Sequence, residues 1–294
     1  MAVNIERVGD FAMVWGESLR WDDRRQRLYF VDCAAQTLHW LDGAEPPLQT
    51  MKLPSMAAGI VLTETGQLVA CLDDGLHVVD PDAGTTELLA VYPEDMLGRA
   101  NDANADGSGN LVTGTLNMGP APGATFWFSA LDGWRRLDDD IANTNGPVVI
   151  DVAGQETLVV GDTPAAAVYA YPYDGAAGTI GARRVFGDHA PLDGMPDGAT
   201  ADAENGVWSC VLRVGKIARF TAAGLDRVVD VPMPNPSDVA FGGPGLDTLF
   251  VTSIALNLGE PAEPTAEGGR VLAITGLGVV GRPEPRFAFA TSRP

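Results

Sequence analysis

Gly109-Asn110-Leu111-Val112-Thr113-Gly114-Thr115, followed by Ala124-Thr125-Phe126-Trp127-Phe128 and then by Asp132-Gly133, is the stretch that decides the fold. Its two short runs are rich in β-branched, aromatic and leucine side chains, which are typical of β-strands. The Asp-Gly pair that closes the stretch favours a tight turn, because both residues tolerate turn conformations. The stretch therefore predicts a unit of strand, loop, strand and turn.

The same unit occurs six times along the chain. The first strands of the units begin at positions 28, 68, 111, 158, 207 and 249, which gives steps of 40, 43, 47, 49 and 42 residues. A period of about 45 residues with short β-runs predicts a β-propeller with four strands per blade, and six units predict six blades. A two-sheet sandwich is the alternative, but it does not need such a regular repeat over the whole length.

The six units span nearly the whole chain, so we expect residues 1–294 to form a single all-β propeller domain. Two further β-type runs, Val3–Val8 and Arg286–Ala290, lie outside the units. We expect these two runs to pair in or beside one blade. They would close the ring there and shield its open strand edges.

Composition excludes several classes of partner. The chain has 39 acidic and 19 basic residues and a formal net charge of −20, whereas nucleic acids and anionic membranes attract clustered Lys and Arg. No apolar run is long enough to span a bilayer, and no apolar run follows a basic start at the N-terminus. The cysteines are three and far apart, which suits buried free thiols in a reducing compartment: Cys33, Cys71 and Cys210. We therefore expect a cytoplasmic protein.

Oxygen-bearing side chains precede four of the units, in segments that we expect to be loops. They are Glu17, Asn101, Asn145 and Asp197, at separations of 84, 44 and 52 residues, or about two, one and one blades. A propeller gathers equivalent segments at one end of its axis. Two carboxylates and two carboxamides gathered there predict an oxygen-rich site suited to Ca²⁺, Mg²⁺ or Mn²⁺. The alternative for the segment around Asn101 is an Asx-rich surface turn.

Two other kinds of catalytic site find little support. The three histidines (His39, His77 and His189) are too scattered for a zinc cluster, although His189 lies shortly before Asp197. Ser18 and Ser237 lack the Gly-x-Ser-x-Gly pattern of a nucleophile elbow, which argues against a serine hydrolase.

At these segments the sequence resembles the senescence-marker-protein/gluconolactonase/luciferin-regenerating family, also called regucalcin-like. The matching motifs follow one another at blade spacing: Gly16–Trp21 with Leu28–Asp32, Arg99–Asp102 with Gly114–Leu116, Thr144–Pro147, Pro196–Gly198 with Gly206–Trp208, and Phe241–Leu249. Each motif alone is a weak signal, but five in order cover nearly the whole chain.

The resemblance implies a six-bladed propeller with one divalent cation on its axis and, in the sugar-acid lactonase branch, a hydrolase that opens a sugar-acid lactone to the aldonic acid. Gluconolactonase and xylonolactonase are the members most similar in kind. The resemblance gives Glu17, Asn145 and Asp197 the metal-ligand role and gives Arg99 and Asn101 contact with the substrate, with Asn101 close to the metal. Calcium is the expected cation, and Zn²⁺, Mg²⁺, Mn²⁺ or Fe²⁺ are the alternatives. We expect Asp197 to act also as the general base.

Two segments depart from the family pattern. The segment Asn117–Ala124 lacks the carboxylate that many sugar lactonases carry there, and Leu212–Gly215 replaces a Trp-Gly-Gly-like loop. Both should lie at the pocket rim, so they leave the particular lactone open. The alternatives are a hydrolase of non-sugar lactones or phosphotriesters and a metal-binding propeller without catalysis. The expected partner is a small molecule, and the sequence leaves the oligomeric state open.

Overall fold

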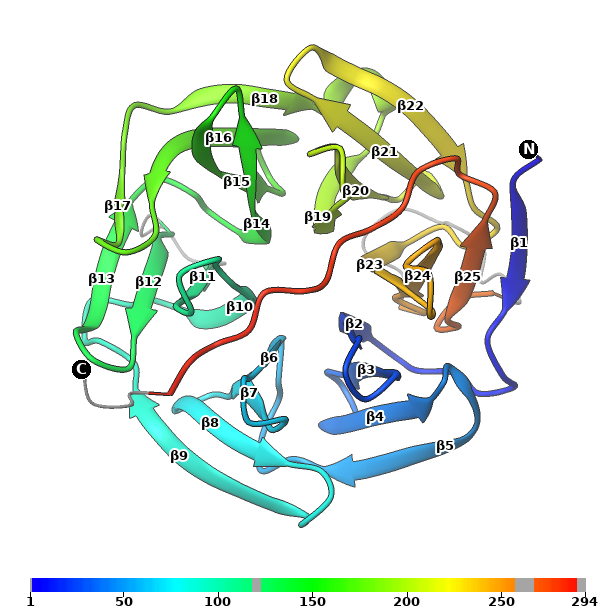
Figure 1. Cartoon of the computed structure of the whole chain (residues 1–294), viewed down its shortest axis with the longest axis horizontal. Coiled ribbons are helices and arrows are strands. Elements are labelled where there is room, and N and C mark those ends of the chain that lie inside the picture. The colour runs from blue at the N-terminus through cyan, green and yellow to red at the C-terminus, as the bar shows by residue number, and fades with distance from the viewer. Residues whose placement is uncertain (1, 118–122, 257–266, 290–294) are drawn as a thin grey trace.

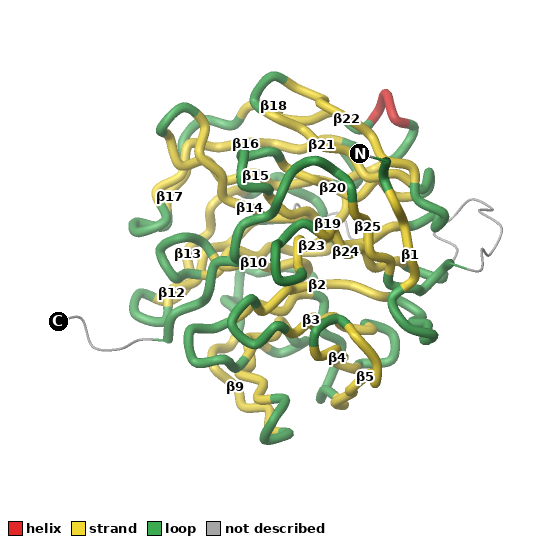
Figure 2. The backbone as a smooth tube through the Cα atoms, turned by 45° about the vertical axis from the view of Figure 1, so that its right-hand side comes forward, coloured by secondary structure: helices red, strands yellow, loops and turns green. Residues whose placement is uncertain are grey.

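The computed structural model describes residues 2–117, 123–256 and 267–289. Six antiparallel sheets stand in a ring around a central axis, as Figure 1 shows. The chain is thus an all-β, six-bladed β-propeller, as the repeat predicted. In the described residues the helical structure is a single short turn, η1 (Ala190–Leu192), visible in Figure 2, so no helix there has the length or apolar character to cross a membrane.

The blades follow one another in sequence, each running from its innermost to its outermost strand. Blade 1 holds β2 (Gly16–Asp22), β3 (Arg27–Asp32), β4 (Thr37–Asp42) and β5 (Glu45–Lys52). Blade 2 holds β6 (Gly59–Leu62), β7 (Leu68–Cys71), β8 (Gly75–Asp80) and β9 (Thr85–Val91). Blade 3 holds β10 (Arg99–Ala105), β11 (Leu111–Leu116), β12 (Thr125–Ser129) and β13 (Gly133–Asp138).

The second half of the ring repeats this plan with two variations. Blade 4 holds β14 (Thr144–Val152), β15 (Gln155–Asp162) and β16 (Ala167–Asp174), with both β17 (Thr179–Ile180) and β18 (Arg184–Asp188) paired to β16. Blade 5 holds β19 (Met195–Ala201), β20 (Val207–Leu212), β21 (Lys216–Thr221) and β22 (Gly224–Asp230). Blade 6 holds β23 (Pro236–Gly242), β24 (Thr248–Ser253), β25 (Leu272–Thr275) and β1 (Asn4–Arg7).

The hydrophobic core is divided into six clusters, and each cluster fills the space between two neighbouring blades. One of them joins Tyr29 and Trp40 of blade 1 to Ile60 and Leu68 of blade 2. Each sheet therefore buries both of its faces, which explains why the strands read as nearly continuous apolar runs rather than strict alternations. The tryptophans Trp21, Trp127 and Trp208 are buried in these layers, as packing residues should be.

The two ends of the chain do not meet in one blade, contrary to the expectation from the sequence. β1 pairs with β25 and completes blade 6, so the N-terminal run closes the ring. Phe287 instead forms a parallel bridge with Thr63, at the end of blade 2. Because β24 and β1 occupy both edges of β25, the C-terminal run cannot pair with β25 as well.

Residues 276–289 form a C-terminal strap that crosses the middle of the ring, drawn in red in Figure 1. The strap is tied to blade 5 by the bond from Ala203 N to Val280 O, to blade 2 by Phe287 N to Leu62 O, and to blade 3 by Ala288 N to Gly109 O. All three anchors lie beyond or at the carboxyl ends of inner strands. The strap therefore closes one end of the axis, which we call the strap end.

Candidate functional site

The candidate residues lie at the opposite end of the axis, which we call the site end. Glu17, Asn101, Asn145 and Asp197 are each the second or third residue of an inner strand, respectively β2, β10, β14 and β19. The sequence analysis expected loops here, and that expectation is wrong. The segments are strands whose amino ends converge on the axis, so the backbone of each blade fixes the direction of the side chain.

An irregularity at one position explains why these strands do not read as strands. The register shifts by an extra residue in five of the six inner strands, between Glu17 and Arg20, Ala100 and Ala103, Asn145 and Val148, Pro196 and Ala199, and Pro236 and Val239. Such a β-bulge bends the strand and turns its side chains toward a new direction. The repeated bulge therefore presents polar side chains to the axis in blade after blade.

Glycine at the bulge has a steric reason in blades 4 and 5. A Cβ on Gly198 would lie 2.2 Å from Asp238 Oδ1, and a Cβ on Gly146, whose φ is +51°, would lie 2.5 Å from the Cβ of Ala199. Both glycines allow the neighbouring inner strand to approach closely. This explains the Asn-Gly and Asp-Gly pairs in the motifs around Asn145 and Asp197.

A hydrogen bond joins Asn101 to Asn145, and further bonds lead to the residue before Asp197. Asn101 Nδ2 donates to Asn145 Oδ1 at 2.8 Å and also to Asn143 Oδ1 and Thr144 O, each at 3.0 Å. Asn145 Nδ2 donates to Thr163 Oγ1 at 2.6 Å, and that hydroxyl donates to the carbonyl of Pro196, next to Asp197, at 2.9 Å. Asn101 thus holds the amide of Asn145 in place through its Nδ2 group.

Arg99 begins β10 and lies beside Trp15 of blade 1. Its guanidinium carbon is 5.6 Å from the centre of the Trp15 ring, within range of a cation–π contact. The indole Nε1 of Trp15 donates to Glu17 Oε1 at 3.2 Å. Among the described residues Arg99 has no ion pair with a carboxylate, so its guanidinium remains able to bind a polar group of a substrate.

The two carboxylates of the candidate site are poorly compensated. Asp197 is buried, with 5% exposure, and Glu17 is half-buried. Burial, and then the charges of Glu17, Asp102 and Asp238, raise the pKa of Asp197 well above its usual range. Burial, and then the charges of Asp238 and Asp102, likewise raise the pKa of Glu17. Neither carboxylate forms an ion pair with Arg or Lys in the described part of the chain.

Beneath these residues lies an ionic cluster that the sequence analysis missed. Arg20, only 2% exposed, contacts Asp238 Oδ2 at 3.1 Å and Asp102 Oδ1 at 3.3 Å. Asp238 also accepts from Leu19 N, and Asp102 from Gly146 N, so each carboxylate links two neighbouring blades. Burial, and then the charge of Asp102, raise the pKa of Asp238 to about 8, although Arg20 opposes the shift.

A signal for this cluster was present in the sequence. Asp102 is the second residue after Ala100, where the bulge of blade 3 begins, and Asp238 is the second residue after Pro236, the equivalent position of blade 6. Recognising the equivalence required the inner strands to be identified as strands with bulges. Once the bulges are known, both aspartates fall at the axis.

The donor set fits a hard divalent cation. Two carboxylates and an amide oxygen are the oxygen ligands that such cations prefer, and buried carboxylates without a cationic partner are costly unless an ion neutralises them. In the described residues no group of three His, Cys, Asp or Glu side chains has the arrangement of a metal site. The set of Glu17, Asn145 and Asp197 contains only two such residues, because the third is an amide.

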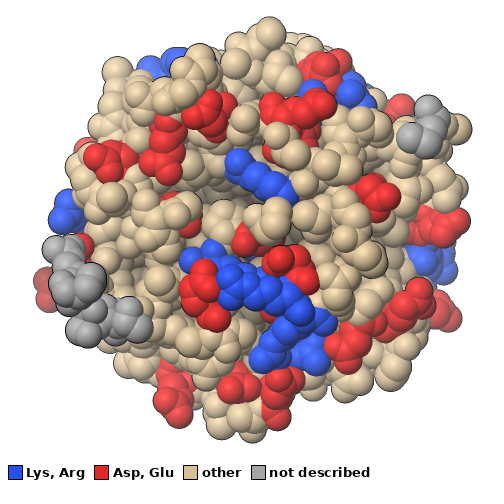
Figure 3. Space-filling model, in the orientation of Figure 1, with Lys and Arg blue, Asp and Glu red and all other residues tan. Residues whose placement is uncertain are grey.

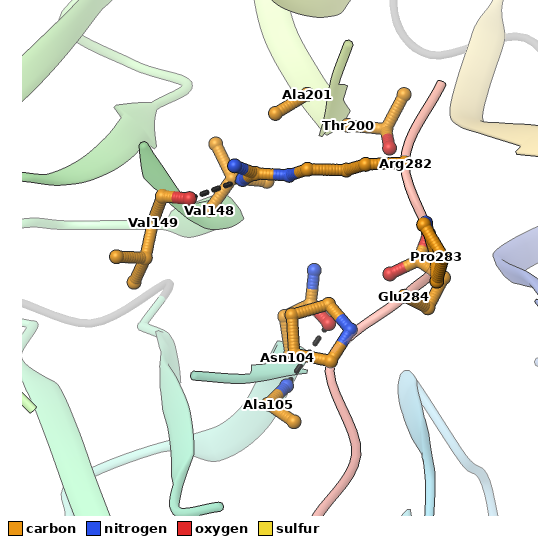
Figure 4. Close-up of a pocket in the computed structure, with 10 residues that line it drawn as sticks. Asn104, Ala105, Val148, Val149, Thr200, Ala201, Arg282, Pro283 and Glu284 are labelled. Carbon is orange, nitrogen blue, oxygen red and sulfur yellow. Dashed lines mark hydrogen bonds between the residues drawn. The ribbon is translucent and has the colours of Figure 1, made fainter. Parts of the chain in front are cut away.

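The strap end has a different character. Figure 4 shows Arg282 reaching from the strap to the carbonyl of Val149 in β14, beside a cavity of about 10 Å³ that Asn104, Thr200 and Glu284 also line. A space of this size holds at most about one water molecule. Burial, opposed by Arg20 and Arg282, raises the pKa of Glu284. The axis is therefore closed to a substrate from this side.

Two rim segments flank the site end. Leu116 pairs with Arg99 at the start of the segment 117–124, of which residues 118–122 lie outside the described residues. Leu212 pairs with Met195, and Arg213 follows with φ of +75°. Both departures from the family pattern thus begin at the end of the axis where the candidate residues lie.

The remaining residues named from the sequence are structural. Cys33, Cys71 and Cys210 are buried free thiols, as expected. His39 bonds to Thr37 and Thr50, and His77 to Asp74. His189 is fully buried against Phe220, with ring centres 5.1 Å apart, and does not reach the site. Ser18 accepts from Ile60 N and acts as a link between blades.

Comparison with known proteins agrees with this geometry. Residues 15–255 match the family described as the SMP-30/Gluconolactonase/LRE-like region. Pentonolactonase XacC of Haloferax volcanii is 31% identical over 302 residues, covering 97% of this chain and 98% of that protein. The 6-deoxy-6-sulfogluconolactonase of Pseudomonas putida is 32% identical over 285 residues, covering 94% and 95%.

A solved structure extends the likeness to three dimensions. The calcium-binding protein regucalcin from Agrobacterium tumefaciens str. C58 superposes with a TM-score of 0.85 at 26% identity, covering 96% of each chain. The match extends over all six blades and not only over the motif segments.

Proposed function

Because the chain belongs to the SMP-30/gluconolactonase/LRE-like family, we propose that it is a metal-dependent hydrolase that opens the lactone ring of a sugar acid to give the aldonic acid. Two relatives of about one-third identity, matched over nearly their whole length, are named as sugar lactonases, which supports the reaction class. The observation that carries the proposal is the pair Glu17 and Asp197, two carboxylates at the axis without a cationic partner among the described residues.

The proposed cation ligands are Glu17, Asn145 and Asp197, with calcium as the first choice of ion. When bound, a divalent cation supplies Lewis-acid stabilisation of the negative charge that develops on the lactone carbonyl oxygen. The protein contributes the shape of the site. Asn101 keeps the amide of Asn145 oriented through its 2.8 Å hydrogen bond, and the bulged strands hold the two carboxylates at the axis.

Asp197 is the proposed general base. Its carboxylate is buried at the axis, and the raised pKa of this group makes it a stronger proton acceptor once it is ionised. It would take the proton of the water that attacks the carbonyl carbon. The C–O bond of the ring then breaks, the ring oxygen takes up a proton, and the product is the open hydroxy acid.

Arg99 and Asn101 are the proposed substrate contacts. Both lie on β10, and the guanidinium of Arg99 is free of carboxylate partners among the described residues. They would bind hydroxyl or ring oxygens of the sugar and orient the carbonyl toward the attacking water. No covalent nucleophile is required.

A second candidate function is cation binding without lactone turnover. The structural likeness to a protein named as calcium-binding favours it specifically. This alternative needs Glu17, Asn145 and Asp197, but it gives no role to the unpaired guanidinium of Arg99.

One experiment separates the two functions. Chelator-treated protein is assayed by pH-stat titration against a panel of aldonolactones and simple aliphatic lactones, alone and with Ca²⁺, Mg²⁺, Mn²⁺, Zn²⁺ or Fe²⁺ restored. Acid release from a sugar lactone above the spontaneous rate, dependent on one of these ions, is the expected result. Cation binding without turnover of any lactone would overturn the hydrolase proposal and favour the second candidate.

A further inference from the structure

Trp15 occupies a place between two functional groups that belong to different blades. It lies just before β2 of blade 1, and its indole Nε1 donates to Glu17 on that strand at 3.2 Å. The face of the same ring lies 5.6 Å from the guanidinium carbon of Arg99, which begins β10 of blade 3. One side chain therefore contacts both a proposed metal ligand and a proposed substrate contact.

The backbone of Trp15 is held firmly enough to make this contact meaningful. Trp15 N donates to Asp32 Oδ1 at 3.2 Å, and its carbonyl accepts from Cys33 N at 2.9 Å. Trp15 also forms an isolated bridge with Ile254 of blade 6. Its ring packs on the cluster between blades 1 and 2. Blades 6, 1 and 2 together thus fix the indole.

Arg99 depends on this contact for its direction. Blade 2 lies between blades 1 and 3 in the ring, so the Arg99 side chain must extend over the start of blade 2 to reach Trp15. Besides this cation–π contact, the guanidinium donates a long hydrogen bond of 3.4 Å to the carbonyl of Ala100. A long, flexible side chain without an ion pair in the described residues would otherwise sample many rotamers.

We propose that Trp15 is a positioning residue that orients Glu17 through its indole N–H and Arg99 through its ring face. The inference rests on the proposed function and deepens it, because it couples the cation site to substrate binding through one side chain. A hydrogen bond to a metal-ligating carboxylate fixes its orientation, and loss of such partners typically weakens metal binding. An arginine held on an aromatic ring loses less freedom when it binds a substrate.

Two substitutions separate the two contacts. Trp15→Phe keeps an aromatic face but removes the N–H, whereas Trp15→Leu removes both. The matched control is Trp40→Phe. Trp40 is buried in the same cluster, and the guanidinium carbon of Arg27 lies 5.8 Å from the centre of its ring. Trp40 lies on β4, outside the site. A loss that reflects only packing would appear equally in the control.

The cation arm is read by isothermal titration calorimetry of chelator-treated protein with Ca²⁺ or Mn²⁺. Trp15→Phe and Trp15→Leu should each weaken binding by about tenfold, the low end of the loss seen for partners of metal ligands. Trp40→Phe should bind like the parent. If Trp15→Phe binds the cation as tightly as the parent, or if the parent binds neither ion, the proposal that Trp15 orients Glu17 for cation binding is overturned.

The substrate arm is read from KM and kcat at saturating cation. Trp15→Leu should raise KM by about fivefold at nearly unchanged kcat, as expected for a lost cation–π contact, while Trp15→Phe changes KM by no more than about twofold. In an Arg99→Ala background, Trp15→Leu should add nothing further. An equal rise of KM in that background would show that Trp15 does not act through Arg99.

Failure of the proposed function leaves the inference testable. If the parent hydrolyses no lactone, calorimetry still decides the contact with Glu17. A crystal structure of Trp15→Leu decides the other contact: Arg99 should move from the position it has in the parent. An unmoved Arg99 would overturn that part.

Discussion

The two ends of the propeller axis differ in how their acidic side chains are paired with arginine. At the strap end, Arg286 contacts Asp22 at 2.7 Å and Asp23 at 2.6 Å, and Arg24 contacts Glu64 at 2.8 Å. Figure 3, which views this face, shows basic side chains lying across its middle beside acidic ones. At the site end, Glu17 and Asp197 have no such partner among the described residues.

This difference supports the proposal that the functional site lies at the site end. Burial of a carboxylate is unfavourable, and a chain under selection for stability alone would supply an arginine, as it does at Asp22. Under the proposed function, a bound cation neutralises the charge that the described residues leave uncompensated at the site end. A divalent cation meets that need with a single ion. The Arg20 cluster between the two ends neutralises only part of the charge, because one guanidinium faces Asp102 and Asp238 together.

The largest expected effect is on turnover. Asp197→Ala removes the proposed base and one cation ligand, and kcat/KM for the sugar lactone should fall by about 10³-fold or more. The measurement is initial-rate kinetics by pH-stat at several cation concentrations. Asp23→Ala, at the strap end, removes a carboxylate that pairs with Arg286 and should leave turnover within about twofold of the parent. Near-parental turnover in Asp197→Ala would break the comparison.

The next effect is on stability, and it should have opposite signs at the two ends. Asp22→Asn leaves Arg286 with a weakened buried partner and should lower the free energy of unfolding by about 3 kcal/mol. Glu17→Gln should raise it in chelator-treated protein at pH 7. The raised pKa of Glu17 means that its ionised form disfavours the folded state, and glutamine carries no charge.

Urea unfolding of both variants in the presence of chelator checks these signs. The side-chain amide oxygen of Gln can still accept from the Trp15 indole, so Glu17→Gln tests the charge with little change of shape. A loss of stability in both variants would mean that the Glu17 carboxylate is already compensated in the folded protein.

A cation should stabilise the protein through the site end alone. At a free Ca²⁺ concentration of about 100 times its dissociation constant, the parent should gain about 2.7 kcal/mol of unfolding free energy. Thermal or urea unfolding with and without Ca²⁺ measures the gain. Glu17→Gln at the same Ca²⁺ concentration should gain much less, whereas Asp23→Ala should gain as much as the parent. Equal gains in all three proteins would place cation binding elsewhere.

The sequence predicted the blades better than it predicted the site end. The apolar strands repeat because both faces of each blade pack against neighbouring blades. The repeat predicted the start of the second strand of every blade to within three residues. Glu17, Asn145 and Asp197 were singled out as candidates by residue type and spacing, and the family resemblance implied their metal-ligand role. Their strands were read as loops because a bulge interrupts the pattern of a strand where Gly and Pro allow it.

The strap and the ionic cluster could not be predicted from local pattern. Arg20 and Asp238 are 218 residues apart, and the sequence around either residue does not indicate that the two side chains pair. The strap ends in the short β-type run Arg286–Ala290, which gave no sign of the blade that it joins, and its contacts with blades 2, 3 and 5 follow from where the chain crosses the ring. Long-range placement of this kind depends on the closed ring, which only the full fold defines.

His189 sharpens the comparison, because it is a buried group without partners that we do not connect with function. It precedes β19 and is fully buried, and neither ring nitrogen has a hydrogen-bond partner among the residues that the structure describes. Burial lowers its pKa from 6.5 to about 4, so the group stays neutral where Glu17 and Asp197 are expected to carry charge. A buried titratable side chain without a partner therefore indicates a bound ligand only when the side chain carries its charge at the pH at which the protein works.

This reasoning predicts a pH dependence of stability. The folded protein disfavours the protonated imidazole, whereas the unfolded chain binds the proton below pH 6.5. The free energy of unfolding is therefore unaffected by His189 above pH 6.5 and decreases as the pH falls toward 4. Between pH 7.5 and pH 5 the loss should be about 2 kcal/mol. His189→Leu keeps an apolar side chain against Phe220 and should lack this component. The difference in unfolding free energy between parent and variant, measured by urea unfolding at each pH, isolates it from all other titrating groups. A difference that stays constant from pH 7.5 to pH 5 would mean that the imidazole gains a partner when it is protonated, and the contrast with Glu17 and Asp197 would then lose its basis.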